Sequence, residues 1–366
     1  MTYVMSTEDM KAYTETRITG DNFPASEIRE VALHQGMLPS MVQSELGTNA
    51  VPVIQTQGRE PLFRVGHALH IPQYSGFARG RRYMRMLERY KKECRPDLEI
   101  RVEYPRGSRR EANINFDNFA YDFKAGLFVP EGRYESRRVF PNHDIKDVRT
   151  IVFGPCQALA EHGSVIAKGQ SEYLDALLLN IHGNPVLSLG YVYGDQAGIL
   201  IDKMLREYDA VAGDAKIPLH IFMFGRVGGL EAAMQRHDLA FPTGIINDGD
   251  FQRGRARVYP VHNAFERGLW NSLNVPSVVD QTTEQLLRAR EAGCSIVEME
   301  AFEAAQSINR ARERYSDSLN VHFGYVGHVS DLPLQGDTLA KELDSDEGEQ
   351  RAVERIVQHI KDQHVA

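Results

Sequence analysis

Short apolar runs alternate with amphipathic stretches along the second part of the chain, beginning near Arg149. The runs RTIVFGP, PVLSLGYVYG and PLHIFMFGRVGG are apolar over most of their length, and the helical patterns QALAEHG and QAGILIDKMLREY lie between them. A strand that is apolar on both faces must be covered on both sides, as in α/β proteins. We therefore expect residues 148–366 to form a three-layer α/β/α domain with a central mixed sheet.

The first 147 residues are more irregular and predict a smaller α+β N-terminal domain to which the sequence assigns no role. A chain of 366 residues suits two domains, because single hydrophobic cores stop growing at about 250 to 300 residues. Local patterns predict helices over Ser26–Leu46 and Arg81–Cys94, and strands over Leu98–Tyr104 and Ala125–Val129. The polar segment PNHDIKD closes this part of the chain.

The composition excludes several classes of protein. With 42% hydrophobic and 25% charged residues, the chain is expected to form a globular core. No apolar run reaches the roughly 18 residues of a membrane-spanning helix, and the N-terminal residues do not resemble a secretion signal. Cys94, Cys156 and Cys294 form no CxxC pair, so neither disulfides nor zinc are indicated and a cytoplasmic location is expected. The net charge of −8 argues against nucleic acid as a partner.

Arginines are concentrated in the stretch SGFARGRRYMRMLERYKKE. They are Arg79, Arg81, Arg82, Arg85 and Arg89. Guanidinium groups match phosphate oxygens, so the stretch is a candidate phosphate site. The alternative is a solvated helix face opposite inward-pointing apolar residues, and we favour it for any single arginine here.

Three apolar segments end in residues that can carry chemistry. In Phe224–Gly229, the glycines suit a turn whose backbone N–H groups meet an anion, although glycine also serves connection geometry alone. In Ser295–Ala301, Glu298 and Glu300 flank a methionine where a strand gives way to a helix. The run Val326–Pro333 ends in Ser-Asp, which by itself is most often a turn or a helix cap.

The order and spacing of GRVGG, VEMEA and VSD closely resemble the nucleoside phosphorylase and nucleosidase superfamily over residues 148–366. The segments VSDLPLQGDTLAKEL and GRVGGLEAAMQRHDLAF look most like the AMP nucleosidase branch, whereas residues 1–147 match no part of it. The resemblance implies a nucleoside phosphorylase-like fold. It also implies an enzyme that cleaves the N-glycosidic bond of a purine nucleoside or nucleotide.

By this resemblance, Asp331 protonates the leaving base and Ser330 orients its carboxyl group. Glu300 accepts hydrogen bonds from the ribose hydroxyls as the sugar becomes cationic, and Met299 packs against the sugar or base. Glu298 is either a substrate contact or a solvated acid that leads a helix, with even support for the two. The other substrate-binding positions that the resemblance implies are Gly225, Arg226, Val227, Gly228, Val279, Asp280 and Gln281.

Departures from the family pattern bear on the second substrate. The first strand ends in Gly154–Gln157 without an arginine, and Met223 stands where phosphorylases have a basic residue, so the cradle for inorganic phosphate is incomplete. Water is therefore favoured as the nucleophile, with Glu161 or His162 as candidates to activate it. Arg226 is assigned to a substrate phosphate, with a bridge to a neighbouring acid as the alternative. Phosphorolysis and a catalytically inactive nucleoside-binding protein stay open.

The expected partners are a small-molecule nucleoside or nucleotide, with phosphate as an optional second ligand, and further copies of the chain in a homo-oligomer. Neither a membrane nor nucleic acid is expected as a partner. The chemistry needs no cofactor and no metal, and His67 and His70 lack further ligands close in sequence. His328, on the apolar run before Asp331, fits a core histidine with satisfied ring nitrogens.

Overall fold

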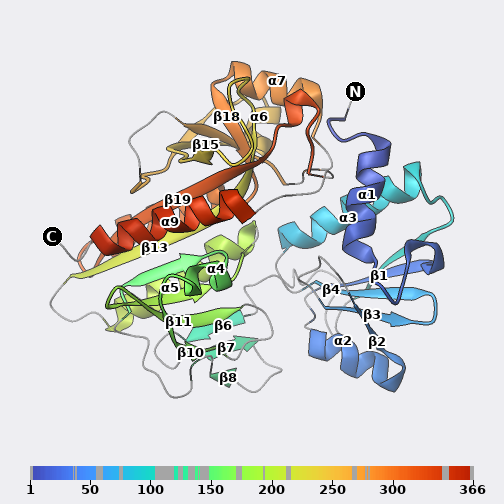
Figure 1. Cartoon of the computed structure of the whole chain (residues 1–366), viewed down its shortest axis with the longest axis horizontal. Coiled ribbons are helices and arrows are strands. Elements are labelled where there is room, and N and C mark those ends of the chain that lie inside the picture. The colour runs from blue at the N-terminus through green and yellow to red at the C-terminus, as the bar shows by residue number, and fades with distance from the viewer. Residues whose placement is uncertain are drawn as a thin grey trace. The chain divides into compact units, whose positions relative to one another are not determined.

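The computed structural model divides the chain into two compact units (Figure 1). Unit 1 comprises Met1–Phe116, Pro276–Thr283 and Thr338–Glu342, and unit 2 comprises Asp117–Val275, Glu284–Asp337 and Leu343–Ala366. The structure describes residues 3–35, 37, 39–54, 61–73, 77–103, 119–122, 127–130, 137–138, 140, 148–169, 175–192, 194–211, 216–265, 270–276, 278, 281–339 and 346–362. The domain boundary predicted between residues 147 and 148 borders a segment outside these ranges and stays a prediction. None of the described helices combines the length and apolar character needed to cross a bilayer.

Unit 1 contains a five-stranded mixed sheet. Its spatial order is β2 (Val51–Val53), β3 (Leu62–Val65), β4 (Ala68–Gln73), β1 (Glu30–Gln35) and β5 (Glu99–Glu103). Strand β1 pairs in parallel with both β4 and β5, whereas β3 pairs antiparallel with β2 and β4. Because β1 has a paired strand on each side, its four middle residues are all buried.

The described helices of unit 1 are α1 (Thr7–Ile18), α2 (Pro39–Leu46) and α3 (Phe77–Glu93), with the 3-10 turns η1 (Ala25–Glu27) and η2 (Gly47–Asn49). Helix α1 begins after Ser6, whose hydroxyl oxygen accepts from the backbone N–H of Asp9 at 3.0 Å. The apolar residues Tyr83, Met86, Leu87 and Tyr90 of α3 are buried. The predicted helix over Arg81–Cys94 and its inward apolar face are therefore confirmed.

One arginine of α3 has a structural role. Arg89 is buried, its Nη2 donates to the carbonyl of Met5 at 2.8 Å, and its Nε donates to Glu93 at 3.0 Å. Its guanidinium also lies 4.0 Å from the centre of the Tyr3 ring. Arg89 thus holds the N-terminal segment against α3.

The helix predicted over Ser26–Leu46 is wrong. This segment contains η1, the central strand β1 and α2 in succession. The run VALHQ suits either a short buried strand or a buried helical turn. Its pairing with β4 and β5, tens of residues away in sequence, decides in favour of the strand.

The described strands of unit 2 include an 11-stranded mixed sheet. Its main path is β10 (Ser164–Lys168), β11 (Ala176–Ile181), β12 (Asn184–Leu189), β9 (Thr150–Phe153), β13 (Ile217–Gly229), β18 (Cys294–Glu298), β17 (Asn271–Asn274), β15 (Gly244–Asn247) and β16 (Val258–Pro260). The long strand β19 (Leu319–Asp331) pairs with β13 and with β14 (Leu239–Ala240). A separate three-stranded sheet contains β6 (Phe119–Asp122), β7 (Leu127–Pro130) and β8 (Arg137–Arg138).

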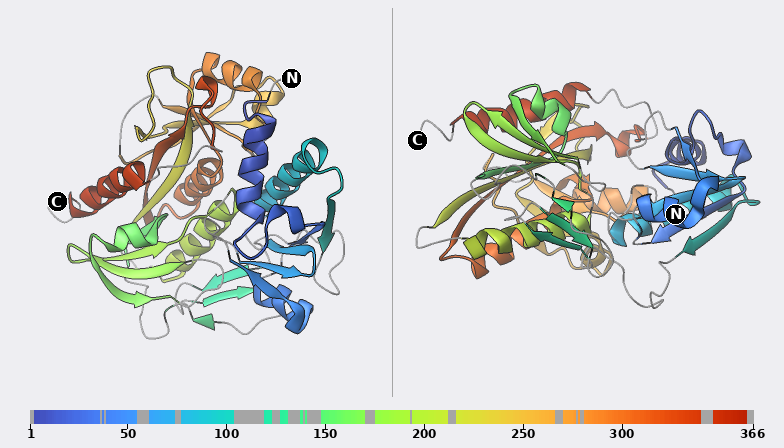
Figure 2. Two further views of the ribbon diagram at one scale, coloured as in Figure 1. Left: turned by 45° about the vertical axis from the view of Figure 1, so that its right-hand side comes forward. Right: turned by 90° about the horizontal axis from the view of Figure 1, so that it is seen from below.

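Helices cover both faces of the large sheet (Figure 2). On one face, α4 (Cys156–Ala160) and α9 (Asp346–Asp362) share an apolar cluster with Phe222, Phe224 and Val326 of the sheet. On the other face, α5 (Asp195–Val211) packs against α8 (Ala301–Arg314). Short helices α6 (Asp248–Gln252) and α7 (Thr283–Glu291) and the turn η4 (Pro333–Gln335) complete the described elements of this part. The predicted three-layer α/β/α architecture with a mixed sheet is confirmed.

Candidate active site

The glycine-rich segment is the end of a strand. Phe224–Gly229 belongs to β13, and the turn predicted there is absent because the segment pairs with β19 on one side and β18 on the other. A Cβ at Gly225 would overlap the Tyr325 hydroxyl, and one at Gly228 would lie 2.8 Å from Cγ1 of Val297. The glycines are therefore needed where side chains of neighbouring strands cross β13 closely. The role of Gly225, Val227 and Gly228 in substrate binding stays a prediction.

Glu298 ends β18 and caps the helix that follows. Its Oε2 accepts from the backbone N–H groups of Glu300 at 2.7 Å and Ala301 at 2.5 Å. Its Oε1 accepts from the amide of Asn274 at 2.9 Å. Burial raises the pKa of Glu298 to about 7, although these three hydrogen bonds oppose the rise. Glu298 is thus a buried acid that leads α8, rather than a solvated one.

Glu300 and Met299 occupy the turn between β18 and α8. Glu300 is the N-cap of α8, its side chain is buried, and its carboxylate does not cap the helix because Glu298 does so. Burial raises the pKa of Tyr325 well above its ordinary value, and the charges of Glu298 and Glu300 add to that rise. Met299 is partly exposed.

Asp331 is the last residue of β19 and is buried, with 7% of its surface exposed. The hydroxyl of Ser330 donates to its Oδ1 at 2.9 Å. Burial raises the pKa of Asp331 to about 7; the hydrogen bond from Ser330 opposes the rise, Asp337 adds to it, and the Arg236 guanidinium opposes it. Arg236 and Asp337 form a bidentate ion pair with two contacts of 2.6 Å. Asp331 is thus a carboxyl group that can hold a proton near neutral pH.

The sheet register brings two of the predicted motifs to the end of β13. Gly228 is in register with Asp331 of β19 on one side and with Val297 of β18 on the other. Neighbouring strands lie about 4.8 Å apart, so Asp331 and Val297 are separated by roughly 10 Å across the sheet. Glu298 follows Val297 directly. The two acidic motifs therefore lie within the reach of one small ligand.

Arg226 lies on a different face of β13 from Gly225, because successive side chains of a strand alternate. Its Nη2 is 3.9 Å from Oε2 of Glu349 on α9, and Glu349 also accepts from the Tyr191 hydroxyl at 2.6 Å. The predicted bridge to a neighbouring acid is therefore present at long range. Because 30% of the Arg226 side chain is exposed, it retains access to solvent, and its role toward a substrate phosphate stays a prediction.

His328 is in register with Arg226 and is almost fully buried. Its ring stacks on Phe224 with centroids 5.4 Å apart. Contrary to the expectation of satisfied nitrogens, neither ring nitrogen has a hydrogen-bond partner among the described residues. Burial, with Arg226 and His237 nearby, lowers the pKa of His328 to about 3. The residue is neutral and structural at ordinary pH.

The remaining predicted residues lie elsewhere or outside the described ranges. Val279 and Asp280 are outside the described residues. Gln281 is buried in unit 1, where its carbonyl accepts from the backbone N–H of Val4 at 3.0 Å. Glu161 and His162 are exposed after α4. Each proposed role of these residues stays a prediction.

No group of three His, Cys, Asp or Glu side chains within the described ranges is arranged to hold a metal ion. Sequence reasoning missed the hydroxyl of Tyr325 and the Arg236–Asp337 pair beside Asp331. Asp337, six residues after Asp331 in the run SDLPLQGD, is the one member of the pair that the sequence places near Asp331. The arginine lies 101 residues from its partner, which no local pattern indicates.

Comparisons with known proteins give similarities of fold only. No protein-family model and no curated protein matches the sequence. Purine nucleoside phosphorylase from Toxoplasma gondii in complex with immucillin-H is 14% identical over 63% of this chain and 100% of its own, with a TM-score of 0.43. Uridine phosphorylase from Schistosoma mansoni in complex with thymidine is 12% identical over 60% and 87%, with a TM-score of 0.43.

A third similar structure is 5'-methylthioadenosine/S-adenosylhomocysteine nucleosidase from Neisseria meningitidis in complex with methylthio-immucillin-A. It is 15% identical over 58% of this chain and 97% of its own, with a TM-score of 0.40. TM-scores this low do not assign a chain to a family. The function proposed below therefore depends on the residues of this chain.

Proposed function

We propose that the protein cleaves the N-glycosidic bond of a purine nucleoside or nucleotide, with water as the nucleophile. The observation that carries the proposal is the environment of Asp331. Its carboxyl group is buried at the end of β19, is oriented by Ser330 and has a pKa raised to about 7. A general acid works best when its pKa lies near the operating pH.

The reaction requires charge stabilisation at two places. As the bond between C1′ of the sugar and the base nitrogen breaks, the base takes a proton from Asp331 and the sugar develops positive charge. Water adds to C1′, and the proton that it releases restores the protonated form of Asp331, so the products are the free base and the free sugar or sugar phosphate. Glu300 accepts from the ribose hydroxyls and stabilises the cationic sugar.

Two features, one on β13 and one directly after β9, favour water over inorganic phosphate as the nucleophile. Met223 stands where the resemblance expects a basic residue, and its side chain is buried in the sheet. Gly154–Gln157 contains no arginine, so an incoming phosphate ion lacks a counter-charge from either segment. A phosphate carried by the substrate is a different case, because the Arg226 side chain is 30% exposed and its ion pair with Glu349 is long at 3.9 Å. AMP is the substrate that combines these features with the resemblance to AMP nucleosidases.

Base release decides the proposal. Purified protein is incubated with AMP, adenosine, inosine and uridine, each with and without inorganic phosphate, and the products are separated by chromatography. We expect free adenine and ribose 5-phosphate from AMP without added phosphate. Ribose 1-phosphate formed only when phosphate is present would replace hydrolysis with phosphorolysis. Saturable binding of AMP without base release would identify an inactive binding protein.

A paired substitution separates the chemistry from the fold. Asp331→Asn keeps the shape of the side chain and removes the acid, whereas Asp317→Asn makes the same change at an exposed position before β19. The proposal requires loss of base release in the first variant and full activity in the second.

A further inference from the structure

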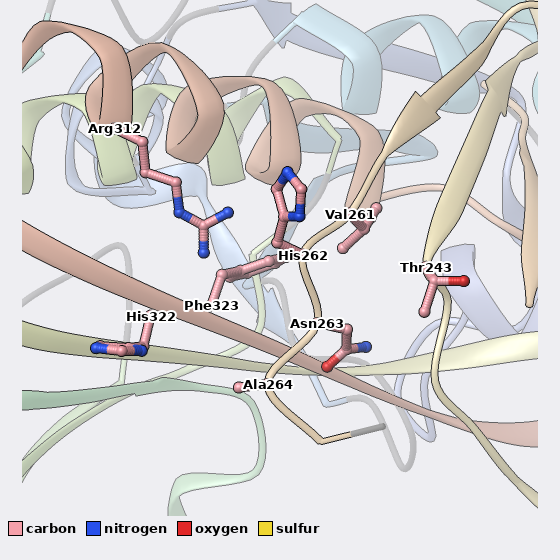
Figure 3. A pocket seen from close by; sticks show the side chains of 8 residues that line it. All are labelled: Thr243, Val261, His262, Asn263, Ala264, Arg312, His322 and Phe323. Carbon is pink, nitrogen blue, oxygen red and sulfur yellow. The ribbon is translucent and has the colours of Figure 1, made fainter. Parts of the chain in front are cut away.

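A cavity of about 400 Å³ lies in unit 2 (Figure 3). It is lined by Thr243, Val261, His262, Asn263, Ala264, Arg312, His322 and Phe323. Asp331 follows Phe323 by eight residues in β19, and a strand rises about 3.3 Å per residue, so the two lie roughly 26 Å apart. The cavity is therefore remote from the proposed active site.

The wall of the cavity formed by residues 261–264 is fixed by hydrogen bonds. Asn263 forms a parallel bridge with Phe323, and its amide donates to the carbonyls of Pro242 at 3.1 Å and Tyr325 at 2.8 Å. The backbone N–H of Ala264 donates to the carbonyl of Phe323 at 2.8 Å. The cavity is thus formed before any ligand binds, which lowers the entropic cost of binding.

A cation that has no ion pair with any described residue faces this space. Arg312 extends from the last turn of α8 toward β19, and its Nε donates to the carbonyl of Val321 at 3.0 Å (Figure 3). None of the eight lining residues is acidic, and no ion pair of Arg312 is present within the described ranges. Burial lowers the pKa of Arg312. Its terminal N–H groups can therefore satisfy an anion.

The histidine beside Arg312 is neutral and adds a donor. His322 stacks on His220 with ring centroids 4.7 Å apart. The amide nitrogen of Asn320 lies 3.0 Å from Nε2 of His322, so Nε2 accepts and the proton stays on Nδ1. Burial and the nearby Arg312 lower the pKa of His322, so the group does not compete with the guanidinium for an anion as a second cation.

We propose that this cavity binds a small organic anion, through a carboxylate or phosphate group that pairs with Arg312. Phe323, Val261 and Ala264 supply apolar surface for the body of the ligand, and the volume suits a small metabolite. The pairing is bidentate because the guanidinium fork matches two oxygens of either group. This site is independent of the glycosidic chemistry proposed above.

Titration calorimetry with three defined anions tests the proposal. The probes are benzoate, phenyl phosphate and inorganic phosphate, added to the full chain at low ionic strength. Saturable binding of benzoate or phenyl phosphate, tighter than that of inorganic phosphate, is expected because the ring contacts the apolar wall. The preferred probe of the two shows whether the carboxylate or the phosphate is the better partner. Absence of saturable binding for all three probes overturns the proposal.

Variants locate the bound anion. Arg312→Gln should weaken binding by about 30-fold or more, as for loss of one half-buried charge pair. Arg314→Gln removes the same charge from an exposed position of the same helix and should leave the affinity unchanged. Ala264→Phe fills the cavity without touching Arg312, which keeps the test valid if Arg312→Gln folds poorly. Equal weakening by Arg312→Gln and Arg314→Gln, or undiminished binding in Ala264→Phe, contradicts a site in this cavity.

Discussion

Gly225 of β13 leaves the space that the hydroxyl group of Tyr325 in β19 occupies. The same hydroxyl has no hydrogen-bond partner among the described residues. Removing it should therefore cost little, because an unsatisfied buried polar group destabilises a fold. Tyr325→Phe is expected to leave the free energy of unfolding unchanged or to raise it by up to about 1 kcal/mol.

The complementary change should be destabilising. Gly225→Ala is expected to lower the free energy of unfolding by about 1 to 3 kcal/mol through steric overlap. Combined with Tyr325→Phe, most of that loss should be recovered, because the atom that the new methyl group meets is gone. Urea unfolding of the four proteins measures the coupling, and strictly additive effects would show that the two groups do not meet.

Glu298 should matter for the fold as well as for the site. Glu298→Ala leaves two buried backbone N–H groups without their acceptor and should cost about 2 to 4 kcal/mol of unfolding free energy. Glu298→Gln keeps one carbonyl oxygen for the helix, and Asn274 can rotate its amide to accept from the new amide group. We expect a cost of about 1 kcal/mol for it. Similar losses for both substitutions would contradict the capping role.

The pH dependence of Asp331 provides a third test. Its protonated form is the active acid, so turnover should fall as the pH rises through about 7. Asp331→Asn should reduce turnover by roughly 100-fold and remove this pH dependence. If wild-type turnover does not change between about pH 6 and pH 8, Asp331 is not the acid of the mechanism.

Asp331 should also affect stability in a defined direction. Its pKa is raised from 3.8 to about 7 on folding, so its contribution to stability is complete below 3.8 and is lost as the pH rises through about 7. The stability of the wild type relative to Asp331→Asn should therefore decline over that interval. Burial raises the pKa of Glu298 as well, but Glu298 is present in both proteins. The difference in stability between them therefore reports on Asp331 alone.

His328 should act in the opposite direction. Its pKa falls from 6.5 to about 3 on folding, so its contribution is present above 6.5 and is lost as the pH falls toward 3. The stability of the wild type relative to His328→Leu should decline by about 1.4 kcal/mol for each pH unit below 6. Urea unfolding of the two proteins at a series of pH values measures this trend.

Arg226 can be tested with matched substrates. Arg226→Ala should weaken AMP binding by about 30-fold or more and affect adenosine little, because only AMP carries the phosphate. Glu349→Gln removes the acid that competes for the guanidinium, so it should strengthen AMP binding. If both substrates are weakened equally by Arg226→Ala, Arg226 serves the pairing of β13 with α9 alone.

The sequence predicts well the elements whose apolar residues must be covered by other parts of the chain. The α/β architecture of unit 2 and helix α3 are visible because runs such as PLHIFMFG must be covered, and because Tyr83, Met86, Leu87 and Tyr90 recur at helical spacing. The motifs VEMEA and VSD can be placed at strand ends because each follows an apolar run of this kind.

Features that depend on distant partners are not predictable from one chain. The strand β1 depends on β4 and β5, and the extended glycine segment depends on β18 and β19. The sequence left Glu298 as a substrate contact or a solvated acid; the structure buries it, and one of its hydrogen-bond partners, Asn274, lies 24 residues away. Local propensity cannot weigh such pairings, because their energy comes from residues that the pattern does not include.

Unit 1 is assembled from three separate stretches of the chain, the last of which ends at Glu342. Val4 donates to the carbonyl of Gln281, so the stretch around residue 281 completes the packing of an N-terminal segment that Arg89 also holds. During synthesis this part of the packing of unit 1 forms only after residues 276–283 have emerged. A fragment that stops after residue 147 would lack these later stretches, and its folding would report on an incomplete unit.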